Sequence, residues 1–173
     1  TSIDLIPWLC DDNQELITKY IAQSSSEMCI GHFELNGFYF YKGVKSHGTE
    51  PDFLRKYKWV KSGHFHTKSK ARNVEYIGTP YTITAGDEDD IRGFYHLTEN
   101  DFKFIVNPKI WHRKITYPTS KGMDLSELEN CSVRLVVTSV DNDLDKFQTE
   151  LESKVHSLSI ISSVVRLEEG VVE

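Results

Sequence analysis

Two short apolar runs in this chain each end in a Gly-His step, and these steps constrain the fold more than any other feature. Met28 to Ile30 has the composition of a buried strand and stops at Gly31-His32. Lys58 to Lys61 forms a second such run and stops at Ser62-Gly63-His64. In open α/β sheets, ligands bind in the crevice beyond the carboxyl ends of the strands. The sequence therefore predicts an α/β fold with a functional site at that edge.

The remaining pattern up to residue 117 alternates short strands with short helices. Strands are predicted at 3–8, 37–41 and 74–77, and helices at 14–23 and 52–57. Four further strands are expected to be antiparallel because their connections are too short for crossover helices, namely 82–84, 92–98, 102–106 and 110–117. The acidic run Asp87–Asp90 between them is interpreted as a solvated loop.

A polar stretch at 118–130 is predicted to be a domain boundary. Beyond it the pattern is strand (133–140), helix (143–156) and strand (158–167), which predicts a separate small α+β domain. The expected division is thus 1–117, a linker at 118–130, and 131–173. The chain begins without Met and inside a strand-like run, so we expect a fragment of a longer protein, a processed chain or a deliberately shortened one.

Composition narrows the class of protein. No apolar run reaches the roughly 18 residues that a membrane span requires, so no membrane association is expected. Cys10, Cys29 and Cys131 lack the spacing of a zinc finger and are expected to be buried, reduced thiols of a cytoplasmic protein.

The charge distribution is uneven. The net charge is −6, which argues against DNA binding over the whole surface. The stretch from Phe53 to Val74, however, contains no acidic residue and seven basic ones: Arg55, Lys56, Lys58, Lys61, Lys68, Lys70 and Arg72. Such a stretch is either a local positive field that attracts a polyanion or a solvated basic loop. Under the first interpretation, Lys61, Lys68, Lys70 and Arg72 are the predicted DNA-binding residues.

The histidines carry the chemistry. His64 and His66 are two residues apart at a strand end, where they can spread around a binuclear centre, and His32 ends the neighbouring predicted strand. Neutral imidazole is the commonest protein ligand for first-row divalent metals. We therefore predict that His32, His64 and His66 are metal ligands. No catalytic acid or base is assigned.

Two longer motifs carry a family resemblance. Ser62-Gly63-His64-Phe65-His66, followed by Gly78-Thr79-Pro80-Tyr81, resembles the last metal motif of calcineurin-like metallophosphoesterases. The stretch from Gly31-His32-Phe33-Glu34 to Phe38 is similar to nuclease subunits of the SbcD type, including those of recombination endonucleases of T-even-like phages.

The resemblance implies the carboxyl-terminal half of a metallophosphoesterase sandwich with a small α+β cap. It also implies an endo- or exonuclease of recombination and repair, with two divalent ions, of which manganese is expected. His32 and His64 would bind one ion and His66 the other. The implied partners are DNA, a coiled-coil SMC-like ATPase subunit and a missing amino-terminal half, or a second copy of the chain. The implied location is the host cytoplasm, if the protein is of phage origin.

Earlier motifs of the family are absent. The chain has no Asp-x-His, no Gly-Asp-x-x-Asp with the bridging carboxylate and no Asn-His pair in the required order. A two-metal site needs a bridging ligand, so the chain alone is expected to be inactive. Two alternatives stay open: a non-catalytic module that binds the ATPase or the missing half, and a hydrolase of small phosphoesters or cyclic nucleotides.

Overall fold

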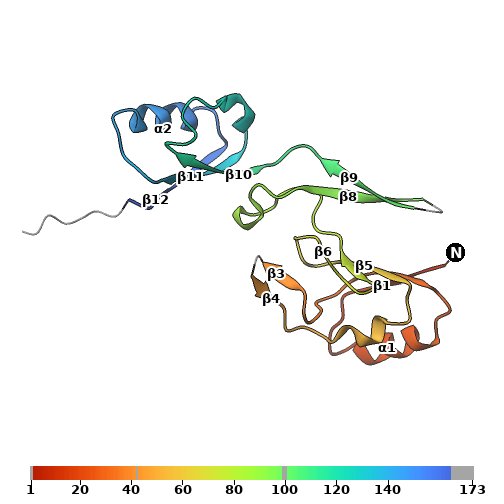
Figure 1. The fold of residues 1–173 in the computed structure, drawn as a ribbon. Helices are drawn as coiled ribbons and strands as arrows, with labels where there is room; N and C mark the ends of the chain where they lie inside the picture. Colours follow the sequence, from red (N-terminus) through yellow and green to blue (C-terminus); the bar gives the residue numbers. More distant parts are fainter. Residues whose placement is uncertain (1, 42, 99–100, 165–173) are drawn as a thin grey trace, which may run out of the picture. The chain divides into compact units, whose positions relative to one another are not determined.

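The computed structural model describes residues 2–41, 43–98 and 101–164, which form two compact units. Unit 1 comprises Thr1–Tyr81 and Ile91–Pro108, and unit 2 comprises Thr82–Asp90 and Lys109–Glu173. The described part is mainly strand with two α-helices, so the predicted α/β class is confirmed (Figure 1). None of the helices in the described residues is both long and apolar enough to span a bilayer.

Unit 1 contains a five-stranded sheet, a small β-ribbon, a long hairpin and two helices. Its elements are β1 (Ile3–Ile6), α1 (Gln14–Gln23), β2 (Met28–His32), β3 (Tyr39–Tyr41), β4 (Val44–Lys45), η1 (Pro51–Leu54), β5 (Trp59–Gly63), β6 (Ser69–Ala71), β7 (Val74–Tyr76), β8 (Arg92–Leu97) and β9 (Phe102–Asn107). The sheet order is β1-β2-β5-β7-β6, with the first four strands parallel and β6 antiparallel to β7. The predicted parallel strands that end in Gly-His are therefore neighbours.

The two faces of this sheet are buried to different extents. One face joins α1, η1 and the segment after β2 in a single hydrophobic cluster, which includes Ile21, Cys29, Val60 and Tyr76. On the other face, Leu5 is 73% exposed and its register neighbour Ile30 is half-buried. Parallel sheets are normally covered on both faces. The open face of β1 and β2 is thus unusual for a parallel sheet.

The hairpin of β8 and β9 covers part of that second face. The two strands are antiparallel, as predicted for 92–98 and 102–106. The ring of Phe102 meets Trp59 edge to face, with centroids 4.3 Å apart. The Lys61 ammonium lies 4.5 Å from the ring centroid of Tyr95 and forms an ion pair with Glu75. Aromatic rings and a paired cation therefore fill the interface between hairpin and sheet.

The described part of unit 2 is a three-stranded parallel sheet with one α-helix and two short 3-10 helices. Its elements are η2 (Ala85–Asp87), β10 (His112–Tyr117), η3 (Leu125–Leu128), β11 (Ser132–Val137), α2 (Leu144–Glu152) and β12 (Ser157–Ser162). The sheet order is β10-β11-β12, and a second hydrophobic cluster forms between this sheet, η3 and α2. The strand predicted at 158–167 runs partly into residues outside the described ones.

The predicted antiparallel arrangement of 110–117 is wrong. β10 pairs in parallel with β11, because the stretch between them is long enough to serve as a crossover connection and contains η3, whose Leu125 and Leu128 are buried. A parallel pair needs a connection of about a dozen residues or more. The expected domain boundary at 118–130 consequently falls inside unit 2.

The segment 82–90 is also different from its prediction. Residues 82–84 form no strand; instead, the Thr82 hydroxyl accepts hydrogen bonds from the backbone N–H groups of Trp111 and His112, at 3.0 and 3.1 Å. Asp87 is 3% exposed, and Glu88 pairs with Arg134 at 3.0 Å. The acidic run is therefore packed into unit 2 and is not a solvated loop.

Candidate metal centre at the carboxyl edge of the parallel sheet

The side chains of Trp8, His32 and His64 meet where β1, β2 and β5 end. The register places Ile6 beside Gly31 and His32 beside Gly63, so the three strands finish at the same edge. The ring centroids of His32 and His64 are 5.5 Å apart. The predicted convergence of these two histidines is present in the structure.

Gly63 makes room for the His32 imidazole. A Cβ atom placed on Gly63 would lie 2.7 Å from His32 Nδ1, closer than such contacts occur. The next residue, His64, has a φ of 94°, which lies in a region of backbone conformation that residues other than glycine rarely adopt. Strain of this kind costs on the order of 1–3 kcal/mol and is found mainly at functional sites. The backbone of 63–64 is thus shaped to hold both imidazoles together.

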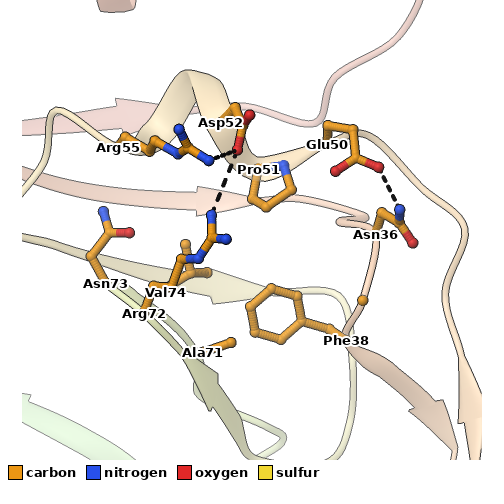
Figure 2. A pocket seen from close by; sticks show the side chains of 11 residues that line it. Asn36, Phe38, Glu50, Pro51, Asp52, Arg55, Ala71, Arg72, Asn73 and Val74 are labelled. Carbon is orange, nitrogen blue, oxygen red and sulfur yellow. Dashed lines mark hydrogen bonds and ion pairs between the residues drawn. The ribbon is translucent and has the colours of Figure 1, made fainter.

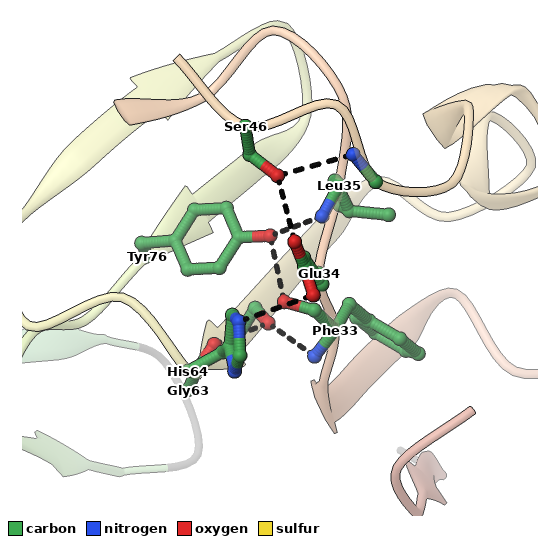
Figure 3. Close-up of polar contacts among 9 residues, drawn as sticks. Phe33, Glu34, Leu35, Ser46, Gly63, His64 and Tyr76 are labelled. Atoms are coloured by element: carbon green, nitrogen blue, oxygen red, sulfur yellow. Dashed lines mark hydrogen bonds and ion pairs between the residues drawn. The ribbon is translucent and has the colours of Figure 1, made fainter. Parts of the chain in front are cut away.

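Two buried hydroxyl groups fix the segment that follows His32 (Figure 3). The Ser62 hydroxyl accepts a hydrogen bond from Phe33 N–H at 3.0 Å. The Tyr76 hydroxyl donates to Phe33 O at 2.8 Å and accepts from Leu35 N–H at 3.1 Å. Burial raises the pKa of Tyr76 above its usual range, so this hydroxyl remains a donor. Side chains of β5 and β7 therefore determine the position of residue 34.

Glu34 is a site residue to which the sequence analysis gave no role. Its Oε2 atom lies 3.7 Å from His64 Nε2, an ion-pair distance if the histidine is protonated, and too long for a hydrogen bond. Its Oε1 atom accepts a hydrogen bond of 3.2 Å from the Ser46 hydroxyl. The available signal was a carboxylate two residues after a strand-terminal histidine.

The electrostatics of His64 favour a neutral imidazole. Burial is the largest influence on its pKa and lowers it, and the charges of His32 and His66 lower it further, against an opposing effect of Glu34. Its Nε2 atom is buried and has no hydrogen-bond partner in the part of the chain that the structure describes. A buried nitrogen with a free lone pair is the donor that a divalent metal requires. This residue therefore fits the role of a metal ligand.

The third predicted ligand, His66, is less closely joined to the pair. Its carbonyl oxygen accepts a hydrogen bond from Thr79 N–H at 3.2 Å, and its ring is near enough to affect the pKa of His64. In the residues that the structure describes, no three His, Cys, Asp or Glu side chains form a group that could hold an ion alone. The site as described is a pair of imidazoles with one carboxylate nearby.

Trp8 is the second residue that the sequence analysis missed. It follows β1 and its ring lies 4.8 Å from that of His64 and 5.6 Å from that of His32. Its indole is 43% exposed. The signal was an aromatic residue at the end of the strand predicted at 3–8, comparable to the histidines at the ends of their predicted strands.

Most of the basic stretch is occupied by partners within unit 1. Lys61, predicted to bind DNA, is only 12% exposed and pairs with Glu75 at 2.5 Å, so its charge is balanced within unit 1. The Lys68 ammonium lies 3.5 Å from the ring centroid of Phe104, and its side chain is exposed, as is that of Lys70. Of the four predicted DNA-binding residues, Lys68 and Lys70 are therefore exposed and form no ion pair with Asp or Glu among the described residues.

The fourth predicted residue, Arg72, lines a separate cavity of about 450 Å³ (Figure 2). Arg72 and Arg55 both approach Asp52 Oδ1, at 3.7 and 2.8 Å. The opposite wall contains Glu50, which accepts a hydrogen bond from Asn36. The guanidinium charges are thus balanced by carboxylates, so this cavity offers no net positive field for a phosphate.

One comparison with known proteins gave a strong match. Exonuclease subunit 1 of Enterobacteria phage T4 is 57% identical to the chain over 164 residues, which are 94% of this chain and 48% of that protein. The chain therefore spans about half the length of this curated relative. No protein-family model matches the chain.

Proposed function

We propose that this chain is the carboxyl-terminal portion of a two-metal DNA nuclease of the SbcD type. The observation that carries the proposal is the pair formed by His32 and His64 at the carboxyl edge of a parallel sheet, in which a buried imidazole nitrogen accepts and donates no hydrogen bond among the described residues. The similarity to an exonuclease subunit supports the same class of reaction. The substrate would be a phosphodiester of DNA.

In the proposed site, His32 and His64 hold one divalent ion and His66 contributes to the second, with manganese as the expected metal. When bound, the two ions supply a hydroxide nucleophile and stabilise charge on the phosphate. The residues of this chain orient that chemistry. Gly63 leaves space for His32, and the strained backbone of His64 aims its ring toward the same edge. Glu34, whose Oε2 atom lies 3.7 Å from His64 Nε2, would place a negative charge beside the imidazoles.

The remaining ligands would come from an amino-terminal half, which is also expected to form the second sheet of the sandwich. The open face at Leu5 and Ile30 is where such a sheet would pack. Unit 2 would be the cap. It carries eight Lys and Arg against fifteen Asp and Glu, so contacts with DNA are expected on unit 1. A coiled-coil SMC-like ATPase is the expected partner, and the host cytoplasm the expected location.

Metal binding by the chain tests the site directly. We expect Ni²⁺, which favours imidazole, to bind with micromolar to millimolar affinity, measured by calorimetry. His64→Ala should weaken binding at least about tenfold. His96→Ala is the matched control, because His96 is an exposed histidine of β8. Equal loss in both variants, or none in either, would contradict the assignment.

Activity separates the nuclease from the alternatives. The chain alone should hydrolyse no DNA with Mn²⁺, whereas addition of the other half of a full-length relative should restore hydrolysis that depends on His32 and His64. Turnover of DNA by the isolated chain would contradict the shared site. Restored activity on cyclic nucleotides but not on DNA would favour the small-phosphoester hydrolase. The remaining alternative, a non-catalytic module, is favoured by the incomplete ligand group among the described residues. It would show no activity in any combination.

A further inference from the structure

Trp8 occupies a position that core packing does not explain. It lies between β1 and α1, in a loop that Asn13 fixes: Asn13 Nδ2 donates to Trp8 O at 2.9 Å, and Asn13 Oδ1 accepts from Cys10 N–H at 2.9 Å. The described core of unit 1 includes its neighbours Ile6 and Leu9. Trp8, in contrast, remains 43% exposed. The loop therefore presents a large apolar ring at the surface.

The indole leaves part of its surface available. Its plane is tilted by 47° from that of His64 and by 55° from that of His32. These contacts are tilted and do not stack on the ring face to face, and 43% of Trp8 stays accessible to solvent. An exposed indole that is fixed by its loop is a preorganised surface for stacking.

A second exposed aromatic residue flanks the same histidine. Phe40, at 40% exposure, has its ring centroid 6.3 Å from that of His64. The candidate centre is thus bordered by Trp8 and by Phe40, while the ionic group nearest to His64 is Glu34. A ligand that spans this edge would place a charged group at the imidazoles and a planar apolar group on an aromatic ring. A nucleotide has both parts.

We propose that Trp8, supported by Phe40, forms a stacking subsite for an unpaired nucleobase beside the candidate metal centre. The proposal rests on the proposed function, since it takes the phosphate of the same nucleotide to lie at the histidines. A base inside a duplex is stacked on its neighbours and cannot lie flat on an indole. The subsite therefore selects single-stranded DNA or a frayed end.

The test compares two ligands that differ only in their bases. Binding of a short oligothymidylate and of an abasic oligonucleotide of equal length is measured at one salt concentration, with the full chain alone and with the complementing half. We expect tighter binding of oligothymidylate, accompanied by quenching of tryptophan fluorescence. Trp8→Leu should weaken oligothymidylate about tenfold and leave the abasic ligand unchanged. Trp8→Phe should retain part of the preference, and Phe40→Leu should show a smaller loss than Trp8→Leu.

Controls distinguish stacking from a structural role. Trp111→Phe removes an exposed tryptophan of unit 2 and should not change either affinity. Equal weakening of both ligands by Trp8→Leu, together with weaker Ni²⁺ binding, would mean that Trp8 only supports the histidines. Equal affinity of the unaltered chain for both ligands would overturn the subsite while leaving DNA binding in place. No binding of either ligand would overturn the subsite and the proposed function together.

Discussion

At the scale of single residues, His64 combines features that a packed histidine does not need. Its φ of 94° is strained, its Nε2 atom is buried without a hydrogen bond, and burial lowers its pKa toward the neutral form. Each feature alone is unfavourable for the folded state. Together they prepare a lone pair at a fixed position, which is what binding of a cation requires.

A methyl group at residue 63 should disturb this arrangement. In Gly63→Ala the new Cβ atom would overlap His32 Nδ1, so the imidazole must turn away. We expect Ni²⁺ affinity to fall about tenfold, as measured by calorimetry. Gly122→Ala serves as the control, since its φ of 80° makes the change strained although nothing lies within 4 Å. It should lower the free energy of unfolding by about 1 kcal/mol and leave metal binding unchanged. Unchanged Ni²⁺ affinity in Gly63→Ala would contradict the fitted position of His32.

The Glu75 carboxylate should make stability depend on acidity. Burial raises its pKa, but hydrogen bonds from Lys61 and Tyr95 and the nearby positive charges outweigh this, so the net pKa is lowered. A lowered carboxyl pKa contributes stability above the unfolded value, near 4.5, that is lost as the pH falls through the folded value. Glu75→Gln should therefore reduce the free energy of unfolding by about 1–2 kcal/mol at pH 7, in urea titrations. At pH 3 the difference should be smaller, and an equal loss at both pH values would argue against an ionic role.

At the scale of secondary-structure elements, the position of the segment after β2 depends on neighbouring strands. Tyr76, in β7, contacts the backbone of residues 33 and 35 through its hydroxyl, and Ser62, in β5, contacts residue 33. Two strands, β5 and β7, thus act on one short segment. The hydroxyl groups of Tyr76 and Ser62 hold the backbone on both sides of Glu34 and so keep its carboxylate near His64. The Ser46 hydroxyl also donates a hydrogen bond to that carboxylate directly.

Removal of the Tyr76 hydroxyl should loosen that segment. Tyr76→Phe keeps the buried ring but leaves Phe33 O and Leu35 N–H without this partner in the core. We expect a loss of about 1–3 kcal/mol in the free energy of unfolding, measured by chemical denaturation. Tyr20→Phe is a control, because the Tyr20 hydroxyl bonds to Asp4 at the other side of the unit 1 core and its ring is half exposed. Tyr76→Phe should change Ni²⁺ binding more than Tyr20→Phe does. Equal effects of the two variants on Ni²⁺ binding would argue against a link between Tyr76 and the site.

Local sequence patterns predicted which segments form helices and strands better than they predicted which strands pair with one another. The helix expected at 14–23 is α1, and the runs that end at His32 and Gly63 are neighbouring parallel strands. These features follow from helical spacing and from apolar runs that end in turn residues. The pairing of β10 with β11 could not be predicted, because the polar composition of 118–130 hides a crossover whose burial depends on two leucines.

The same limit applies to the candidate site. His32 and His64 indicated ligands because each follows a glycine at the end of a predicted strand, and the two strand ends share this Gly-His step. Glu34 and Trp8 enter the site only through the conformations of their loops, which include hydrogen bonds from Ser46 and Asn13. The balance of charge in the basic stretch was likewise invisible, because the partners of Lys61 and Arg72 lie elsewhere in the sequence.

At the scale of the whole molecule, the open face of the parallel sheet is the main unsatisfied surface. Leu5 is 73% exposed there, in register with the half-buried Ile30. We expect the chain to self-associate through this face when no other half is present, because exposed apolar sheet faces recruit partners. Light scattering at low micromolar concentration should show assemblies larger than a monomer.

A charge on that face should reduce the association. Leu5→Lys places an ammonium group among the apolar side chains, so the scattering mass should fall toward that of a monomer. Leu16→Lys is the matched control, because Leu16 is 71% exposed on α1, away from this face of the sheet. If both variants behave alike, or if the unaltered chain is a monomer, the open face does not drive association.

The interleaving of the two units also has a consequence for biosynthesis. The chain leaves unit 1 after Tyr81, contributes Thr82–Asp90 to unit 2, returns for Ile91–Pro108 and then completes unit 2. A ribosome therefore finishes every strand of unit 1 before it makes the sheet to which the second segment belongs. During that interval the Thr82 hydroxyl lacks the backbone N–H groups of Trp111 and His112, from which it later accepts hydrogen bonds. The Asp89 carboxylate likewise lacks its ion-pair partner Arg113. Unit 1 can thus fold on the nascent chain before the strands β10, β11 and β12 of unit 2 have been made.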